Sequence, residues 1–184
     1  MKNAKIILAS ASPRRRELLA QAGFEFEVIT SDVDEVVDPG LTPDMLVMSL
    51  ARQKAQAVAV NREDFVVIGS DTVVVLDSQV LGKPKDEAHA VKMLESLSGR
   101  THEVYTGVCI AYGGETHSFF ECTRVNFCEL DPAQINAYVA TKEPMDKAGA
   151  YGIQGKGCVL VEGIEGDYFN VVGFPVSPFC REYK

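Results

Sequence analysis

Apolar and polar positions alternate along this chain in a pattern that predicts strands and helices in turn. Apolar runs typical of buried strands occupy Lys5–Ala9, Phe24–Thr30 and Phe65–Leu76. Apolar residues at helical spacing, with start and stop signals around them, predict helices over Pro13–Ala22, from Thr42 to about Val60, from Asp86 to Gly99, and from Asp131 to about Ala140.

The second half of the chain adds a hairpin. Two long β-type runs, His102–Tyr112 and Thr116–Leu130, flank Gly113-Gly114. A glycine-rich segment, two short strands and a helix after Pro175 are expected to follow. No repeat or flexible linker interrupts this order, so residues 1–184 are expected to form one α/β domain with a mixed sheet, split into two lobes around a cleft.

Composition narrows the possible partners. The 184 residues carry a formal net charge of -8, which argues against a nucleic acid polymer, because such a partner needs a broad basic face. A small anion needs only a local cluster of Arg and Lys. With no apolar leader and no run of membrane-spanning length, the expected location is the cytoplasm, away from membranes. The five cysteines are expected to be buried thiols.

The first predicted helix has an unusual first turn. Ser12 and Pro13 suit its start, but three arginines, Arg14 to Arg16, follow where the helix dipole disfavours cations. Guanidinium groups beside free backbone N–H groups make sense if an anion such as phosphate sits among them. A basic surface turn, whose arginines pair with carboxylates elsewhere, explains the sequence equally well.

Asp71 lies inside the apolar run Phe65–Leu76, where an unpaired carboxylate is costly. A strand-end turn or Asx motif is one explanation. Because Val73–Leu76 resumes the strand directly, Asp71 interrupts the sheet, and a functional role is favoured. A carboxylate there can hold a divalent cation or act as a general base toward water.

Other polar positions have two interpretations each. Asp32, Asp34 and Glu35 are metal ligands or part of a solvated acidic loop. Lys54 shares a face with the apolar stripe of its helix, so it extends to water or reaches into a cleft. Lys83 follows a short turn, where it contacts phosphate or belongs to a surface loop.

The glycine-rich segment from Glu143 to Gly157 offers a third cluster. Its glycines let the backbone approach a ligand closely. The Gln154 amide has both a donor and an acceptor with which to read a base.

Together these segments resemble the Maf family, also called septum-formation inhibitor-like proteins, which are nucleoside triphosphate pyrophosphatases. The motifs that carry the resemblance lie in the family's order and span nearly the whole chain: Leu8-Ala-Ser-Ala-Ser-Pro-Arg-Arg15, Ala51-Arg-Gln-Lys54-Ala, Gly69-Ser-Asp71-Thr72, Gly82-Lys83-Pro84, Leu97-Ser-Gly-Arg-Thr-His-Glu-Val-Tyr-Thr-Gly107, Asp146-Lys-Ala-Gly-Ala-Tyr-Gly-Ile-Gln154-Gly155 and Asn170-Val-Val-Gly-Phe-Pro175. The fold that this implies is an elongated α/β/α sandwich similar to inosine-triphosphate pyrophosphatases.

The resemblance also implies roles for individual residues. Asp71 becomes the catalytic carboxylate and a metal ligand, and Glu35 a partner in metal or water positioning, although Asp34 stays open for that role. The substrate-binding residues that it implies are Ser10, Arg14, Arg15, Lys54, Thr72, Lys83 and Gln154, with Arg14, Thr72 and Gln154 associated with base choice.

The segment ending at Gln154 is similar to the branch that acts on dTTP and UTP, sometimes CTP, with Mg²⁺ or Mn²⁺. The alternatives are a 7-methyl-GTP pyrophosphatase and a non-catalytic nucleotide-binding regulator of cell division. The family suggests a homodimer.

Overall fold

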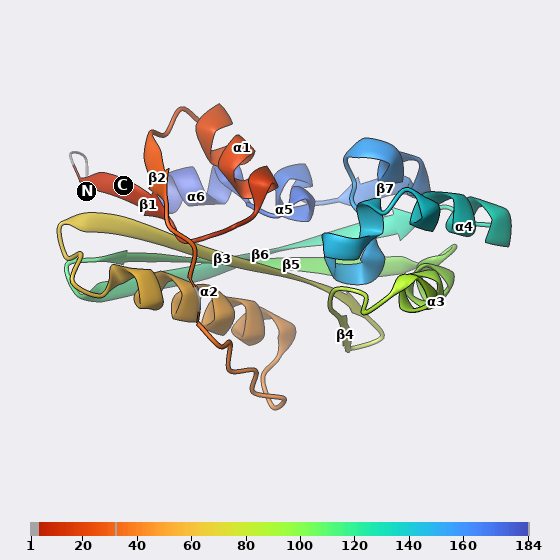
Figure 1. Cartoon of the computed structure of the whole chain (residues 1–184), viewed down its shortest axis with the longest axis horizontal. Helices are drawn as coiled ribbons and strands as arrows, with labels where there is room; N and C mark the ends of the chain where they lie inside the picture. Colours follow the sequence, from red (N-terminus) through yellow and green to blue (C-terminus); the bar gives the residue numbers. More distant parts are fainter. Residues whose placement is uncertain (1–3, 32, 184) are drawn as a thin grey trace. The chain divides into compact units, whose positions relative to one another are not determined.

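The computed structural model describes residues 4–31 and 33–183, so Asp32 lies outside the described residues (Figure 1). The strands are β1 (Lys5–Leu8), β2 (Phe26–Val28), β3 (Phe65–Leu76), β4 (Gln79–Leu81), β5 (Thr101–Tyr112), β6 (Glu115–Phe127) and β7 (Val161–Glu165). The helices are α1 (Pro13–Gln21), α2 (Pro43–Ala59), α3 (Glu87–Leu97), α4 (Pro132–Ala140), α5 (Tyr168–Val172) and α6 (Val176–Glu182). Three short 3₁₀ helices, η1 (Glu143–Asp146), η2 (Ala148–Ala150) and η3 (Gly155–Leu160), lie between α4 and β7.

The strands form one mixed sheet in the order β2-β1-β3-β5-β6-β7, with β4 paired to β3. Strand β1 is parallel to both neighbours, and Ile7 pairs with Glu27 on one side and with Val67 on the other. Each parallel connection contains a helix, as parallel pairing requires. The β4 and β7 pairings are antiparallel. This mixed sheet with helices confirms the predicted α/β class.

The chain divides into two compact units. The first contains the segment ending at Thr72, then Thr106–Glu121, then the segment from Gly173 onward. The second contains Val73–Tyr105 and Cys122–Val172. The chain therefore passes from the first unit to the second within β3, directly after Thr72.

Close packing of α2 on the sheet shapes the first unit. Ala51 and Ala55 of α2 are fully buried against β1, β3 and β5. A Cβ atom at Gly69 would lie 2.2 Å from the Ala51 carbonyl oxygen, and one at Gly107 would lie 2.4 Å from that of Val47. Helices α1 and α6 lie on the other face (Figure 1). Glycine at both positions therefore lets helix and strand backbones meet directly.

The second unit is built around α3 and α4. Apolar residues of both helices share a core with β3, β5 and β6. Each helix begins at a capping aspartate: Asp86 accepts from the His89 N–H, and Asp131 forms a capping box with Gln134. The core also holds His102, whose Nε2 lies 2.7 Å from the Tyr151 hydroxyl.

Most predicted elements are confirmed, with boundary shifts of a few residues. The second of the two short strands expected before Pro175 is wrong, because Tyr168–Val172 forms α5. The pattern also missed β4, which has only three residues. Cys109 is buried as expected, but Cys158 and Cys180 are exposed. No helix in the described ranges is long and apolar enough to cross a membrane.

Candidate active site

Asp71 lies within β3, as the sequence predicts, and the strand continues past it to Leu76. Its side chain is 16% exposed and pairs with the ammonium group of Lys54. An aspartate in this position would be costly without such a partner. The ion pair explains how a carboxylate is tolerated between two apolar stretches of one strand.

Lys54 reaches Asp71 from α2, and its side chain is only 14% exposed. Its Nζ also lies 3.1 Å from Oε1 of Glu35, whose side chain is 41% exposed. Of the two interpretations of Lys54, the structure therefore supports an inward reach to carboxylates. It also brings Glu35 to the ammonium group that Asp71 contacts.

The loop that carries Glu35 is attached to the same helix. The Gln53 side chain accepts from the Val36 N–H at 2.8 Å and donates to the Val36 carbonyl at 3.0 Å. Gln53 and Lys54 are neighbours in α2. One helix therefore fixes both the backbone after Glu35 and the cation that Glu35 meets.

Arg15 forms a second polar centre in this unit. Ser12 caps α1, as predicted, and Arg15 follows in the first turn. The guanidinium group donates from Nε to the Gly173 carbonyl at 2.9 Å, from Nη1 to Ser10 Oγ at 3.3 Å and from Nη2 to Thr72 Oγ1 at 3.0 Å. Arg15 thus links the N-terminal segment to two distant parts of the chain, at Thr72 and Gly173.

Thr72 extends this network, because its hydroxyl lies 2.9 Å from that of Thr106. Thr106 and the Gly173 carbonyl were not among the predicted site residues. Both lie inside quoted motifs, Thr106 directly before Gly107 and Gly173 before Phe174. The available signal was that Thr106 directly precedes Gly107, a glycine that packs closely against α2. The sequence alone does not say whether Thr72 or Thr106 meets Arg15.

The charges around Arg15 are balanced rather than purely positive. Burial lowers the pKa of the Arg15 guanidinium; Asp71 opposes this effect, while the like charge of Arg14 adds to it. Arginine remains charged at neutral pH even so. The first unit therefore places the cations Arg14, Arg15 and Lys54 near the carboxylates of Asp71 and Glu35. Guanidinium and ammonium groups are the side chains that bind phosphate.

The remaining predicted residues lie elsewhere. Lys83 and Gln154 belong to the second unit, and both are exposed. Gln154 is the residue before η3. Asp34 is exposed, and it is Glu35 that meets Lys54. Hydrogen bonds and ion pairs link six predicted residues of the first unit: Ser10, Arg15, Glu35, Lys54, Asp71 and Thr72. Arg14 belongs to the same unit and lies next to Arg15 in α1.

The donor set fits a metal ion that comes with a phosphate ligand. Within residues 4–31 and 33–183, no group of three or more His, Cys, Asp or Glu side chains is placed to hold a metal. Asp71 and Glu35 nevertheless converge on one cation, the Lys54 ammonium group. Mg²⁺ typically binds one or two carboxylates together with substrate phosphates. These two carboxylates suit that arrangement.

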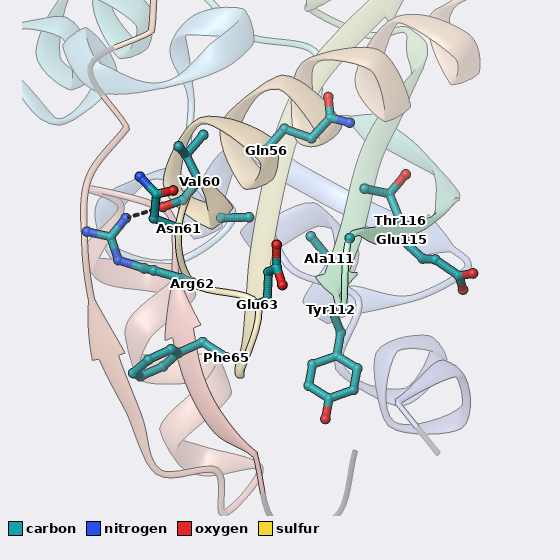
Figure 2. Close-up of a pocket in the computed structure, with 13 residues that line it drawn as sticks. Gln56, Val60, Asn61, Arg62, Glu63, Phe65, Ala111, Tyr112, Glu115 and Thr116 are labelled. Carbon is teal, nitrogen blue, oxygen red and sulfur yellow. Dashed lines mark hydrogen bonds between the residues drawn. The ribbon is translucent and has the colours of Figure 1, made fainter.

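A separate hollow in the first unit lies near the start of β3 (Figure 2). Its lining includes Arg62, Glu63 and Tyr112, and the Arg62 guanidinium is bonded to the Val58 and Val60 carbonyls. Phe65 also lines it, and Asp71 is six residues further along the strand, a span of about 20 Å at 3.3 Å per residue. The hollow is therefore distinct from the charged cluster, which consists of Asp71, Lys54 and Glu35.

Comparison with known proteins places this geometry in a family. Residues 5–184 match the model of the family described as Maf-like protein. A protein of Bacillus thuringiensis subsp. konkukian named dTTP/UTP pyrophosphatase is 57% identical over 180 residues, covering 98% of this chain and 94% of its own. A Bacillus cereus protein of the same name is 56% identical and covers 98% and 89%.

A solved structure supports the fold. The Staphylococcus aureus Ham1 protein matches with a TM-score of 0.50 over 83% of this chain and 77% of its own, at 17% identity. That likeness concerns the fold alone and agrees with the architecture expected from the sequence. The family match spans nearly all of the sequence and includes every residue of the charged cluster, so this chain belongs to the Maf family.

Proposed function

We propose that this protein is a nucleoside triphosphate pyrophosphatase that hydrolyses dTTP and UTP to the monophosphate and pyrophosphate. The observation that carries the proposal is the Asp71–Lys54–Glu35 cluster in the same unit as the Arg15 network. Relatives more than half identical over nearly the whole chain are named dTTP/UTP pyrophosphatase. The cluster supplies the charges that such a substrate needs.

Arg14, Arg15 and Lys54 stabilise the negative charge of the triphosphate in this proposal. Arg15 is already held by Ser10, Thr72 and the Gly173 carbonyl, so its guanidinium group is fixed before substrate arrives. Groups that are held in place lose little entropy when charge develops in the transition state. Lys83 contacts phosphate and Gln154 reads the base in this proposal, as the family resemblance of the sequence implies.

Asp71 acts as the general base. Its carboxylate takes a proton from the attacking water, whose oxygen bonds to the α-phosphorus. The bond from that phosphorus to the α–β bridging oxygen breaks, and pyrophosphate leaves with this oxygen. Asp71 and Glu35 would hold Mg²⁺ or Mn²⁺, which supplies charge neutralisation and a Lewis acid when bound. Lys54 keeps both carboxylates in place.

Product analysis in ¹⁸O-labelled water tests this reaction. We expect dTTP with Mg²⁺ to give dTMP that carries one ¹⁸O atom, together with unlabelled pyrophosphate. Label in pyrophosphate would mean attack at the β-phosphorus, and orthophosphate with dTDP would mean attack at the γ-phosphorus. Tight binding of dTTP without turnover would favour a non-catalytic regulator, and faster turnover of 7-methyl-GTP would favour the other branch.

We further propose that the protein works in the cytoplasm as a homodimer. The support is the family resemblance of the sequence. Sedimentation of the purified protein at micromolar concentration tests the assembly, and a single species of monomer mass would contradict it.

A further inference from the structure

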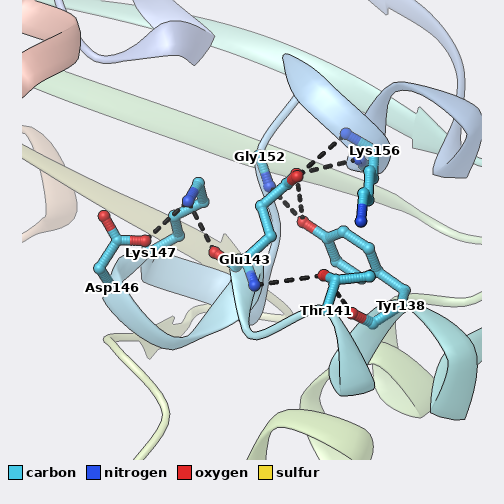
Figure 3. Close-up of polar contacts among 8 residues, drawn as sticks. Tyr138, Thr141, Glu143, Asp146, Lys147, Gly152 and Lys156 are labelled. Atoms are coloured by element: carbon cyan, nitrogen blue, oxygen red, sulfur yellow. Dashed lines mark hydrogen bonds and ion pairs between the residues drawn. The ribbon is translucent and has the colours of Figure 1, made fainter.

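The loop that carries Gln154 is held at its base by two side chains from outside it (Figure 3). The Glu143 carboxylate accepts the backbone N–H groups of Lys156 and Gly157, both at 3.0 Å. The Tyr138 hydroxyl accepts the N–H of Gly152 at 3.1 Å. The loop from 152 to 157 is therefore bonded on both sides of Gln154.

The two holding residues also bond to each other. The Tyr138 hydroxyl donates to Oε1 of Glu143 at 3.1 Å, and the ring of Tyr138 is buried in the core below. Burial raises the pKa of Glu143, but the N–H donors of Lys156 and Gly157 and the Tyr138 hydroxyl outweigh it and leave that pKa below its ordinary value. The carboxylate is therefore ionised at neutral pH and accepts all three bonds.

Steric contacts close the same loop. A Cβ atom at Gly157 would lie 2.2 Å from the Gly152 carbonyl oxygen and 2.7 Å from the Tyr138 hydroxyl, so the two ends of the loop touch. A Cβ atom at Gly155 would lie 2.8 Å from Oε2 of Glu143. Since Gly155 also has a φ of +63°, only glycine fits there without strain. These contacts leave the backbone of Gln154 little room to move.

Hydrogen bonding alone does not give Gln154 a preference for pyrimidines. Its amide donates one bond and accepts another, which matches the O4 and N3–H of thymine or uracil. Guanine presents the same pair of groups as O6 and N1–H on a larger ring system. Discrimination between these bases therefore requires that the Gln154 amide stay in place, so that the larger base does not fit.

We propose that Glu143 and Tyr138 are positioning residues that make the enzyme reject purine triphosphates, because they stop the 152–157 loop from withdrawing to admit a larger base. This inference rests on the proposed base-reading role of Gln154. Neither residue touches the reacting phosphates in this proposal, so both act on substrate choice through Gln154.

The test compares kcat/KM for dTTP and dGTP in Glu143→Gln and Tyr138→Phe variants. In Glu143→Gln an NH₂ group replaces one of the two carboxylate oxygens. The backbone N–H of Lys156 or Gly157 then loses its acceptor and faces another donor. We expect the dTTP to dGTP ratio to fall about tenfold in Glu143→Gln, with a smaller fall in Tyr138→Phe. The matched controls are Glu165→Gln, which removes the same charge from an exposed ion pair with Arg124, and Tyr168→Phe at an exposed position.

A readout independent of activity accompanies this comparison. Amide hydrogen exchange at Lys156 and Gly157 should be slow in the unmodified protein and faster in Glu143→Gln, while exchange in α3 stays unchanged. The proposal would be overturned if the dTTP to dGTP ratio of kcat/KM stayed within roughly threefold of the unmodified protein in both variants. An equal fall in kcat/KM for both nucleotides would overturn it as well. Tyr138→Phe keeps the ring in the core, so the test survives if Glu143→Gln fails to fold.

A Gln154→Ala variant separates this inference from the proposed function. If Gln154→Ala leaves kcat/KM for dTTP unchanged, the base-reading role is wrong. If Gln154→Ala lowers it but Glu143→Gln leaves the ratio intact, the positioning role is wrong. In the Gln154→Ala background, Glu143→Gln should change the ratio no further, because its effect passes through the missing amide.

Discussion

The Lys54 ammonium group donates a hydrogen bond to Asp71, so the carboxylate in the middle of β3 faces a cation supplied by α2. Strand and helix are close enough for this pair because Gly69, two residues before Asp71, lets the helix backbone touch the strand. The same ammonium group meets Glu35. The charge balance of the proposed catalytic centre therefore depends on how one helix packs.

Replacing Asp71 with asparagine tests the general base. The amide keeps the shape of the side chain but does not accept the water proton, so we expect a folded protein whose kcat falls about a hundredfold or more, roughly 2.7 kcal/mol in barrier. Steady-state kinetics with dTTP measures this. Asp77→Asn, at an exposed aspartate paired with Arg100, is the control that should retain activity. Near-normal turnover in Asp71→Asn would remove Asp71 from the mechanism.

Lys54→Met removes the cation and leaves two carboxylates close together. We expect a loss of about 1–3 kcal/mol in the free energy of unfolding, together with a large fall in kcat/KM, because triphosphate also loses a positive contact. Lys54→Arg should recover part of both. Urea unfolding and dTTP kinetics provide the measurements. Lys92→Met, on the exposed side of α3, should change neither, and equal behaviour of the Lys54 and Lys92 variants would contradict the expectation.

Metal binding should depend on the nucleotide. With two carboxylates in the cluster, the protein alone should bind Mn²⁺ weakly, and a non-hydrolysable dTTP analogue should tighten binding through its phosphate oxygens. Titration followed by electron paramagnetic resonance measures free Mn²⁺ in both conditions. EDTA should abolish turnover and excess Mg²⁺ should restore it. Turnover that persists in EDTA would argue against a metal requirement.

Gly69→Ala probes the contact between α2 and β3. The added methyl group would lie 2.2 Å from the Ala51 carbonyl oxygen, so the helix must shift or the variant must unfold. We expect a loss of about 1–3 kcal/mol or more in the free energy of unfolding, and lower activity because Lys54 moves with the helix. Gly163→Ala in β7 meets no atom within 4 Å and is the matched control. Equal stability of the two variants would show that α2 adjusts freely.

His102 makes stability depend on pH. Burial lowers its pKa to about 4, and its Nδ1 has no hydrogen-bond partner among the described residues. Between pH 6.5 and 4 the unfolded chain binds a proton that the folded protein does not, so stability is full above pH 6.5 and falls toward pH 4. The loss in the free energy of unfolding that comes from His102 is roughly 3 kcal/mol at most.

The free energy of unfolding of the His102→Gln variant, measured from pH 7 to pH 4, tests this. Its decline should be shallower than that of the unmodified protein. Parallel curves would mean that other groups cause the decline. The control is His117→Gln, which removes a histidine from an exposed position.

Much of the fold follows from local sequence signals. Ser12, Asp86 and Asp131 mark helix starts that the structure confirms, because each side chain caps free N–H groups. The second short strand expected before Pro175 is wrong, and α5 (Tyr168–Val172) lies there instead. A short apolar run with aromatic residues suits either state, and five residues are too few to show a period.

Individual residues of the candidate site stand out in the sequence, but the contacts between them do not. Asp71 stood out as a charge inside an apolar strand, and Lys54 as a charge on an apolar helix face. That the two meet, and that Glu35 joins them, depends on long-range packing of α2 on β3, which periodicity does not encode. The acceptor role of the Gly173 carbonyl was equally hidden, since a backbone group leaves no trace in residue type.

The bond from Arg15 to Gly173 has a consequence for synthesis on the ribosome. Its partners are 158 residues apart, and the first unit draws on three separate stretches of the chain. Such long-range closure is slow compared with local folding. A nascent chain therefore cannot complete this unit until its last stretch has emerged, and a prematurely terminated product ending before Gly173 would lack the acceptor that holds Arg15.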